Sequence, residues 1–368
     1  MKVRSIIESL DPYVAGLSIN EIQKKYGLST IYKMASNENP LGTSPRVQEC
    51  IKRNANFAFR YPQNGNPRLI KALAEYHNID AKHIVVGNGS DEVIDTLIRI
   101  LAEPKINSIS CFKPCFSIYP IQSKICGVEI KRIPLNEDFS FNFDKLFNTI
   151  DSSTKLVFIT TPDNPSGYCP SKTEVSNFVS RVYDKNPECL VVIDEAYMDF
   201  SENEVENSLL YTNPLPNNVA ILRTFSKSFG LAGIRLGYGI LPKKIASYFR
   251  CAQIPFSVNI LAEEAGLEAL KDTDFRSLTL STVKEGRTYL TNELKNINCK
   301  VFPSSSNFIM FKLPDNTLNP KELFEKLLQH GIIIRYLASY DLPNYLRVSI
   351  GNNEENITFI KTMQKLLH

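Results

Sequence analysis

The sequence predicts an α/β fold: a doubly wound, mainly parallel sheet followed by a smaller α+β domain. From residue 83 onward, short apolar runs alternate with helical segments, which is the pattern of parallel strands joined by crossover helices. The runs are short enough to be buried strands. After Pro242 the pattern changes to long helical segments, followed by a mixed order of strands and helices.

Each element is expected from apolar spacing and from turn residues. The expected strands of the sheet cover residues 83–87, 108–111, 128–133, 155–160, 190–193, 219–222 and 236–241. Helices are expected at 45–54, where Ser44 can cap the first turn, and at 68–77, 93–102 and 172–183. Helices at 243–251 and 260–293 follow, and the second is expected to link two domains. The last part is expected to contain strands at 299–302, 307–311 and 346–349 and helices at 320–330 and 354–367.

This pattern predicts three parts of the chain. Residues 1–36 are expected to form an N-terminal arm that belongs to the small domain. Residues 37–250 form the large domain, and residues 251–368 form the linker helix and the C-terminal small domain. A chain of 368 residues is long enough for two domains.

Composition excludes several classes of function. The formal net charge is +3 and basic residues are scattered, which argues against a nucleic-acid surface. The sequence contains no run of about 18 apolar residues, so no membrane span is expected. Its start does not resemble a signal peptide, so a cytoplasmic location is expected. The eight cysteines form no C-x-x-C pair and are expected to be reduced. The four histidines form no H-x-x-x-H group, so no metal site is expected.

The stretch around Lys227 carries the first indication of chemistry. Lys227 lies just past the expected strand at 219–222, among small and apolar neighbours. Desolvation there favours the neutral amine, which is a nucleophile toward carbonyls. Hydroxyl residues and an arginine suit a phosphate; they are Thr224, Ser226, Ser228 and Arg235. A Schiff-base lysine beside a phosphate cradle suggests pyridoxal phosphate. The alternative is a surface lysine in a glycine-rich loop, and this stretch alone does not decide between them.

Asp194 provides a sharper signal, because it ends a fully apolar run. A carboxylate at the end of a buried strand loses much hydration free energy unless it has a partner. A protonated pyridine nitrogen is a suitable partner, and Tyr197 could meet the phenolate oxygen of the same ring. The competing interpretation is a magnesium-binding aspartate of the Walker-B type. It requires a G-x-x-x-x-G-K-[ST] loop, which the sequence lacks.

Three further turns follow expected strands. The turn containing Gly89, Ser90 and Asp91 can bring backbone amides close to an anion. Phe116 or Tyr119 could stack on a flat ring, and Asn164 can project a neutral hydrogen-bonding side chain. An ordinary capped turn, a core aromatic residue and a plain loop explain these features equally well in isolation. Ligands of α/β sheets bind at the carboxyl ends of strands, however, and the joint order of these turns is specific.

This order resembles that of the fold-type I aminotransferases and, more narrowly, the histidinol-phosphate aminotransferases. The resemblance covers essentially the whole chain. It rests on motifs at residues 10–13 (LDPY), 36–40 (SNENP), 60–62 (RYP), 89–92 (GSDE), 164–167 (NPSG), 194–197 (DEAY), 224–235, 331–335 (GIIIR) and 346–349 (LRVS). Ser166 departs from the threonine that the family usually has there, but it keeps a hydroxyl.

The resemblance implies how the chain binds pyridoxal phosphate. Lys227 matches the lysine that forms the Schiff base, Asp194 the partner of the ring nitrogen, and Phe116 the residue that stacks on the ring. Tyr197 and Asn164 match groups that contact the ring oxygen. The matching phosphate ligands are Gly89, Ser90, Asp91, Thr224, Ser226 and Arg235. Tyr61 matches a tyrosine that reaches the phosphate from a neighbouring subunit, which implies a homodimer.

The resemblance also implies a reaction: transamination of L-histidinol phosphate with 2-oxoglutarate, giving imidazole acetol phosphate and glutamate in histidine biosynthesis. Lys227 would be the general base and, with Asp194 and Tyr197, form the catalytic group. The matching substrate-binding residues are Tyr13, Asn37, Asn164, Arg335 and Arg347. Arg347 matches the arginine that binds carboxylates, and Arg335 and Tyr13 match groups that hold histidinol phosphate.

Alternatives remain inside and outside this class. A threonine-phosphate decarboxylase usually has threonine before the lysine and proline before the Gly-[IL]-Arg segment, where this chain has Ser226 and Ala232. An aromatic or broad-range aminotransferase of the same fold is a second alternative. Outside the class, a non-catalytic α/β ligand-binding domain is the best competitor. A nicotinamide-dependent dehydrogenase is disfavoured because no G-x-G-x-x-G follows the first strand.

Overall fold

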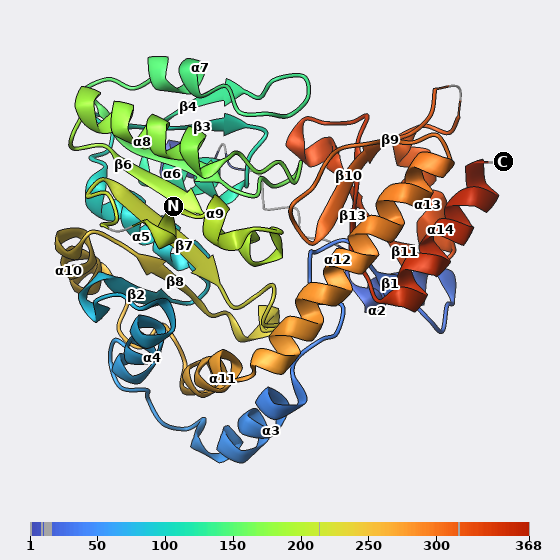
Figure 1. Ribbon diagram of the computed structural model, residues 1–368, viewed down its shortest axis with the longest axis horizontal. Coiled ribbons are helices and arrows are strands. Elements are labelled where there is room, and N and C mark those ends of the chain that lie inside the picture. The colour runs from blue at the N-terminus through green and yellow to red at the C-terminus, as the bar shows by residue number, and fades with distance from the viewer. Residues whose placement is uncertain (1, 9, 11–16, 213, 316, 368) are drawn as a thin grey trace.

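A seven-stranded sheet forms the centre of the larger of two units (Figure 1). The computed structural model describes residues 2–8, 10, 17–212, 214–315 and 317–367. The strand order is β2-β8-β7-β6-β5-β3-β4. The strands are β2 (Ile84–Gly87), β3 (Ser108–Lys113), β4 (Glu129–Pro134), β5 (Thr154–Thr160), β6 (Leu190–Asp194), β7 (Val219–Thr224) and β8 (Gly237–Ile240). Only β8 runs antiparallel to its neighbours within this sheet, so the predicted mainly parallel sheet is confirmed.

Alternate residues of the strands point to opposite faces of the sheet, and helices cover both faces. Val191 and Ile193 of β6 belong to one buried cluster, whereas Leu190 and Val192 belong to the other. The first face packs on α3 (Pro45–Asn54), α4 (Pro67–His77), α7 (Phe143–Asn148), α8 (Lys172–Lys185) and α11 (Ile260–Lys271). The second packs on α5 (Ser90–Leu101), α6 (Ile118–Cys126) and α10 (Lys243–Ala252). The doubly wound prediction is therefore confirmed.

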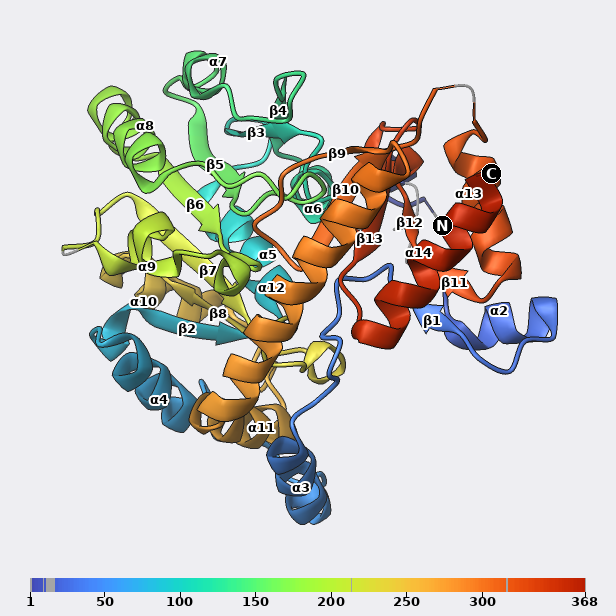
Figure 2. The ribbon, with the colours of Figure 1, turned by 45° about the vertical axis from the view of Figure 1, so that its right-hand side comes forward.

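The smaller unit contains an antiparallel sheet in the order β12-β13-β10-β9. Its strands are β12 (Arg335–Tyr336), β13 (Leu346–Ser349), β10 (Phe308–Lys312) and β9 (Lys300–Val301). Helices α12 (Thr273–Asn296), α13 (Pro320–Gln329) and α14 (Asn353–Leu367) contribute to its core. Figure 2 shows α12 running from beside α11 to this smaller unit. Among the helices of the described residues, none is both long and apolar enough to cross a membrane.

The N-terminal segment contacts both units. Arg4 precedes α1 (Ser5–Glu8), and its Nη2 donates to the carbonyl oxygen of Ile125 in α6 at 2.8 Å. Helix α2 (Ile19–Tyr26) and strand β1 (Tyr32–Lys33) follow, and β1 pairs in parallel with β11 (Ile332–Ile333) of the smaller unit. The domain boundaries after residues 36 and 250 stay predictions.

The expected single helix over residues 260–293 is wrong, because the chain forms α11 and α12 with a break at Asp272. Asp272 is not helical, and its carboxylate accepts a hydrogen bond from the backbone amide of Phe275 at 3.3 Å. The Ser44 hydroxyl donates to the same carboxylate. Asp272 is thus the N-cap of α12, a role that aspartate often takes. Helices α6 and α7 and the two-residue strands β1, β11 and β12 were not predicted.

Candidate active site

A pocket lies at the carboxyl ends of β5, β6 and β7 and collects most of the predicted cofactor residues. It is lined by Ser90, Asp91, Phe116, Thr160, Asn164, Asp194, Ala196, Tyr197, Thr224, Ser226, Lys227, Ala232 and Arg235. These residues come from separate turns, and the parallel strands bring the turns to one edge of the sheet. The structure thus brings side chains from turns far apart in the sequence to one pocket.

Lys227 reaches into the pocket from the loop after β7. Its Nζ donates to the carbonyl oxygen of Ser36 at 3.4 Å and lies 5.4 Å from the centre of the Tyr197 ring. Burial, and next the positive charge of Arg347, lower the pKa of Lys227 from 10.5 to about 8. The lowered pKa moves the amine toward its neutral, nucleophilic form.

Asp194 ends β6 in a buried position. Its Oδ2 accepts a hydrogen bond from Tyr119 Oη at 2.7 Å, and its Oδ1 accepts one from the backbone amide of Ala196 at 3.2 Å. Burial raises the pKa of Asp194 to about 6. In the part of the chain that the structure describes, this carboxylate has no cation within ion-pair distance. A protonated ring nitrogen would supply the missing positive charge.

A chain of hydrogen bonds joins the two units across the pocket. Tyr197 Oη accepts from Asn37 Nδ2 at 3.2 Å and from Asn164 Nδ2 at 3.4 Å. Asn164 Oδ1 in turn accepts from Arg347 Nη1. The backbone amide of Asn37 donates to Ser349 Oγ at 2.8 Å. The predicted residues Asn37, Asn164, Tyr197 and Arg347 therefore form one network.

A cradle for an anion lies at the start of α5. Arg235 donates from Nη1 to Ser226 Oγ at 3.4 Å and from Nη2 to Asp91 Oδ2 at 3.1 Å. Gly89 has φ +77°, and a Cβ there would lie 2.5 Å from Arg235 Nη2, so a side chain would block this approach. The start of a twelve-residue helix favours negative charge.

Two arginines lie opposite each other on neighbouring strands of the smaller unit. Arg335 of β12 pairs with Arg347 of β13 in the sheet register, so both side chains are on the same face. Arg347 is 4% exposed, and its Nη2 donates to the carbonyl oxygen of Ala35 at 3.1 Å. Its Nε has no partner among the described residues. Arg335 is partly exposed and donates to Ser339 Oγ at 3.4 Å.

Five predicted residues of the described part of the chain do not line the pocket themselves: Asn37, Tyr61, Gly89, Arg335 and Arg347. Tyr13 lies outside the described residues. Tyr61 is 80% exposed and does not line the pocket; it packs against Phe256, with the ring centres 4.8 Å apart. A separate hollow is lined by Ala58, Phe59, Arg60, Tyr61, Pro62, Phe256, Asn259, Ile260 and Leu261.

From the sequence, Tyr119 was expected only as a ring that could stack, and the charge cluster near the pocket was not predicted. Tyr119 is fully buried and links Asp194 to Thr160, whose Oγ1 is 2.7 Å from Tyr119 Oη. Behind the pocket, a charge cluster is formed by Glu195, Asp199, Glu204, Arg223 and Arg276. Tyr119 lies three residues after Phe116 in an unpredicted helix, and that spacing was the only available signal.

Comparisons with known proteins agree with this geometry. The family described as aminotransferase class I and II matches residues 29–362. The chain belongs to this aminotransferase family. A histidinol-phosphate aminotransferase of Oleidesulfovibrio alaskensis is 52% identical over 99% of the chain and 95% of its own length. One from Nitratidesulfovibrio vulgaris is 53% identical over 99% of the chain and 96% of its own length.

A solved structure supports the fold of this aminotransferase. The structure of histidinol-phosphate aminotransferase from Sinorhizobium meliloti in complex with pyridoxal-5'-phosphate has a TM-score of 0.89 and 22% identity. The alignment covers 100% of this chain and 97% of the chain from Sinorhizobium meliloti. The predicted fold class, the resemblance to histidinol-phosphate aminotransferases and the dependence on pyridoxal phosphate are confirmed. The non-catalytic and dehydrogenase alternatives are therefore wrong.

The pocket of the aminotransferase fits pyridoxal phosphate on its own chemistry. Asp194 is a buried carboxylate that lacks a cation, which suits the ring nitrogen. Arg235 and the start of α5 suit the phosphate. Lys227 has a lowered pKa and lines the same pocket. Phe116 adds a partly buried aromatic ring to the same wall.

Proposed function

We propose that this aminotransferase transfers the amino group of L-histidinol phosphate to 2-oxoglutarate, giving imidazole acetol phosphate and glutamate. The relatives of more than 50% identity carry the name of this activity over almost their full length. The observation that carries the proposal within the structure is the pair Arg335 and Arg347, opposite each other on β12 and β13, of which Arg347 contacts the pocket residue Asn164. Two anions must be recognised in turn, because one substrate has a phosphate and the other has carboxylates.

We assign the cofactor contacts as follows. Pyridoxal phosphate, when bound, supplies a carbonyl carbon for the amino group and a ring that withdraws electrons from the substrate Cα. Asp194 would hold the ring nitrogen, and Asn164 and Tyr197 the ring oxygen. Phe116 would pack on the face of the ring. The phosphate would be held by Gly89, Ser90, Asp91, Thr224, Ser226 and Arg235, all at or beside the cradle.

Lys227 is the proposed general acid and base. Its Nζ would accept the proton that leaves the substrate Cα and deliver it to the C4′ carbon of the cofactor. A pKa of about 8 suits this exchange, because the group can both take and give a proton near neutral pH. Tyr119 holds Asp194 in place through its hydroxyl, so that the carboxylate faces the pocket.

Arg347 is the proposed carboxylate-binding residue. It is buried, it has no acidic partner among the described residues, and its hydrogen bonds go to Asn164 and to the backbone of Ala35. A guanidinium that is held in place without a counter-ion can receive a carboxylate in a two-point contact. Asn37 supports the same network, and Arg335, which is more exposed, would receive the phosphate of L-histidinol phosphate. Tyr13 is proposed as a further phosphate contact from the resemblance alone.

The test uses the purified protein loaded with pyridoxal phosphate. Borohydride should fix the cofactor to Lys227, as detected by peptide mass, and Lys227→Ala should not be fixed. L-histidinol phosphate, L-phenylalanine and O-phospho-L-threonine are then added separately, and the absorption of the cofactor is followed. L-histidinol phosphate should react at the lowest concentration. A protein that reacts only with phenylalanine, or that releases carbon dioxide from phosphothreonine, would contradict the assigned substrate.

We further propose that the enzyme is a homodimer in which Tyr61 completes the site of the partner subunit. The exposed aromatic residues Phe59 and Tyr61 and the hollow beside Phe256 support such a contact. Mixing Tyr61→Ala and Lys227→Ala subunits tests it. A mixed dimer has one site with both Lys227 and Tyr61, so activity should exceed that of either variant alone. No recovery on mixing, with mixed dimers present, would contradict a shared site.

A cytoplasmic location is also proposed. All eight cysteines are free thiols, as expected of a protein that works in a reducing compartment. Residues 37–250 are proposed as the cofactor-binding domain, and residues 1–36 and 251–368 as the small domain. Limited proteolysis that releases a stable fragment with these ends would support the boundaries.

A further inference from the structure

Residues 337–345 connect the strand of Arg335 to the strand of Arg347. They begin with the 3-10 helix η6 (Leu337–Tyr340) and end directly before β13. Two backbone hydrogen bonds close the segment: the amide of Leu337 donates to Tyr345 O, and the amide of Leu342 donates to Leu337 O, both at 3.2 Å. The segment is therefore compact, and it lies directly between the two strands that carry the arginines.

Arg335 itself is held by this segment. Its Nη2 donates to Ser339 Oγ in η6 at 3.4 Å. On the other side, Arg335 faces Arg347 in the sheet register. Two guanidinium groups on one face repel each other, so contacts that hold Arg335 are needed to keep it beside Arg347 when no anion lies between them.

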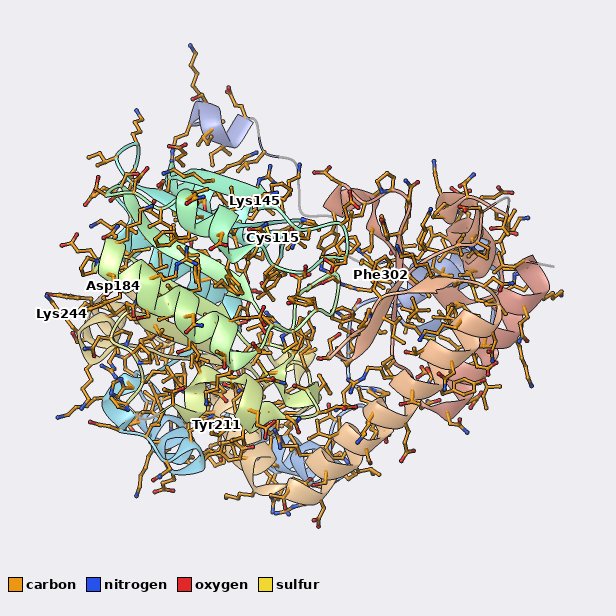
Figure 3. The ribbon with its side chains drawn as sticks, turned by 45° about the horizontal axis from the view of Figure 1, so that its top comes forward. Cys115, Lys145, Asp184, Tyr211, Lys244 and Phe302 are labelled. Carbon is orange, nitrogen blue, oxygen red and sulfur yellow. The ribbon has the colours of Figure 1, made fainter. Side chains whose placement is uncertain are left out.

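A side chain from the larger unit packs against the same segment. Phe139 lies in the turn after β4, and its ring is 5.0 Å from that of Phe302 and 5.3 Å from that of Tyr345, edge to face in both cases. It shares a buried cluster with Met310 and Leu337. Phe302, labelled in Figure 3, lies on the side of the smaller unit that faces the larger unit.

The backbone of Phe139 is in an unfavourable conformation. Its φ is +66°, which is uncommon for a bulky residue. The turn holds it there: the amide of Phe139 donates to Asn136 O at 2.9 Å, and the amide of Asn136 donates to Ser140 O at 3.1 Å. Ser140 Oγ donates to Asp138 Oδ1 at 2.6 Å. The chain therefore accepts a strained residue in order to direct this ring into the other unit.

We propose that Phe139 is a positioning residue for phosphate recognition. It anchors residues 337–345 through Leu337 and Tyr345, and the anchored segment holds Arg335 through Ser339. This inference rests on the proposed function, because it takes Arg335 as the group that binds the substrate phosphate. The exposed ion pair between Lys113 Nζ and Asp341 Oδ2, at 2.9 Å, contributes little to the same contact.

The test compares L-histidinol phosphate with L-histidinol, which lacks the phosphate, on the holoenzyme. The measured quantity is the ratio of kcat/KM for the two substrates. Phe139→Ala should lower this ratio about 10-fold, since a small displacement of a binding group is enough for such a loss. Arg335→Ala should lower it by up to about 100-fold. The double variant should have a kcat/KM ratio no lower than that of Arg335→Ala, because Phe139 acts through Arg335.

The outcomes separate the two proposals, and two further variants serve as controls. If Arg335→Ala leaves the ratio unchanged, the proposed phosphate contact is wrong. If Arg335→Ala lowers the ratio and Phe139→Ala does not, the role of Phe139 is wrong and the proposed function stands. Phe139→Leu keeps apolar bulk, so its ratio should lie between those of the wild type and Phe139→Ala. This variant replaces Phe139→Ala in the test if Phe139→Ala folds poorly. Phe147→Ala is the matched control: its ring packs under Arg181 of the larger unit, so it should affect stability and not the ratio.

Discussion

Two groups of buried charges lie close together at the carboxyl ends of β6 and β7, and they are built in opposite ways. Behind the pocket, Arg223 is surrounded by acids: its Nη2 is 2.6 Å from Glu195 Oε2, and its Nη1 is 3.0 Å from Asp199 and 2.9 Å from Glu204. In the pocket, Asp194 has no ion-pair partner among the described residues, and the same is true of Lys227 and Arg347.

The difference is clearest between neighbours in the sequence. Asp194 and Glu195 are consecutive and both buried, yet only Glu195 has a cation beside it. Arg223 and Arg347 are both buried, yet only Arg223 has carboxylates. A compensated charge contributes to the fold, because removing one member leaves the others unpaired. An uncompensated charge at the edge of a pocket is available for a charge that a ligand brings.

The largest effect is expected from Asp194→Asn. Loss of one member of a buried charge pair costs about 3–5 kcal/mol, so kcat should fall roughly 10²–10⁴-fold once the ring nitrogen loses its partner. Glu195→Gln is the matched change at the next residue and should lower stability while retaining most of the activity per folded molecule. Steady-state kinetics and urea unfolding of both variants measure this contrast. Equal losses of activity in the two variants would break it.

The second comparison replaces the two arginines. Arg223→Met should lower the free energy of unfolding by about 3–5 kcal/mol, because three carboxylates lose their common cation. Arg347→Met should change it by no more than about 1 kcal/mol, since only hydrogen bonds to neutral acceptors are lost, and should raise KM for 2-oxoglutarate. Urea unfolding of the cofactor-free proteins separates the two. A loss of stability in Arg347→Met as large as in Arg223→Met would contradict a ligand-binding role.

The contrast between unpaired and paired charges also explains which site residues could be predicted from the sequence. Asp194 and Lys227 were predictable because each follows an apolar strand, where a charged residue stands out in the sequence. The contact between Tyr119 and Asp194 was not predictable, because it depends on how α6 packs on the sheet. Helix α6 itself has no clear apolar period in the sequence. The cluster around Arg223 was missed for a related reason: its members lie up to 81 residues apart and meet only through the packing of β6, β7 and α12.

The fold was more predictable than the contacts across it. The alternation of strands and helices determines the parallel sheet, and the predicted strands match the observed ones closely. The break at Asp272 was not visible, because aspartate is tolerated within a helix; in the structure its carboxylate caps α12 by accepting from the backbone amide of Phe275. Strands β1 and β12 have only two residues each, too few to show an alternation.

A third prediction concerns the pH dependence of the cofactor-free protein. The pKa of Asp194 is about 6 in the folded state and 3.8 ordinarily. Between these pH values the folded state therefore binds more protons than the unfolded state. The stability of the wild type should therefore fall as pH rises from about 4 to 6, and the cost is fully present above pH 6. Asp194→Asn lacks this group, so it should be more stable than the wild type above pH 6 by on the order of 3 kcal/mol.

Thermal unfolding of both cofactor-free proteins between pH 4 and pH 8 tests this prediction. The plots of stability against pH for the two proteins should converge at the acidic end, where the wild-type Asp194 carboxyl is protonated in both the folded and the unfolded state. Curves that stay parallel over the whole range would mean that Asp194 is already compensated inside the protein.

The smallest effect is expected at the supporting hydroxyls. Tyr119→Phe removes the donor to Asp194 Oδ2 and should lower kcat/KM about 10-fold, the value of one hydrogen bond to a charged group. Ser208→Ala is its counterpart, because Ser208 Oγ donates to Glu195 at 2.8 Å. It should reduce stability and leave the kinetics near those of the wild type. Kinetic losses of similar size in both variants would remove the distinction between the two groups.

The parallel pairing of β1 with β11 has a consequence for protein synthesis. The amide of Met34 donates to Ile333 O at 2.7 Å, and the amide of Ser349 donates to Met34 O at 2.9 Å. Met34 is thus held by residues that are synthesised much later. The central sheet can form during translation, but Asn37 and its contacts with Tyr197 cannot be fixed before the final strands emerge. A ribosome-bound chain that ends before β11 would contain every residue that lines the pocket, but not Arg335 and Arg347.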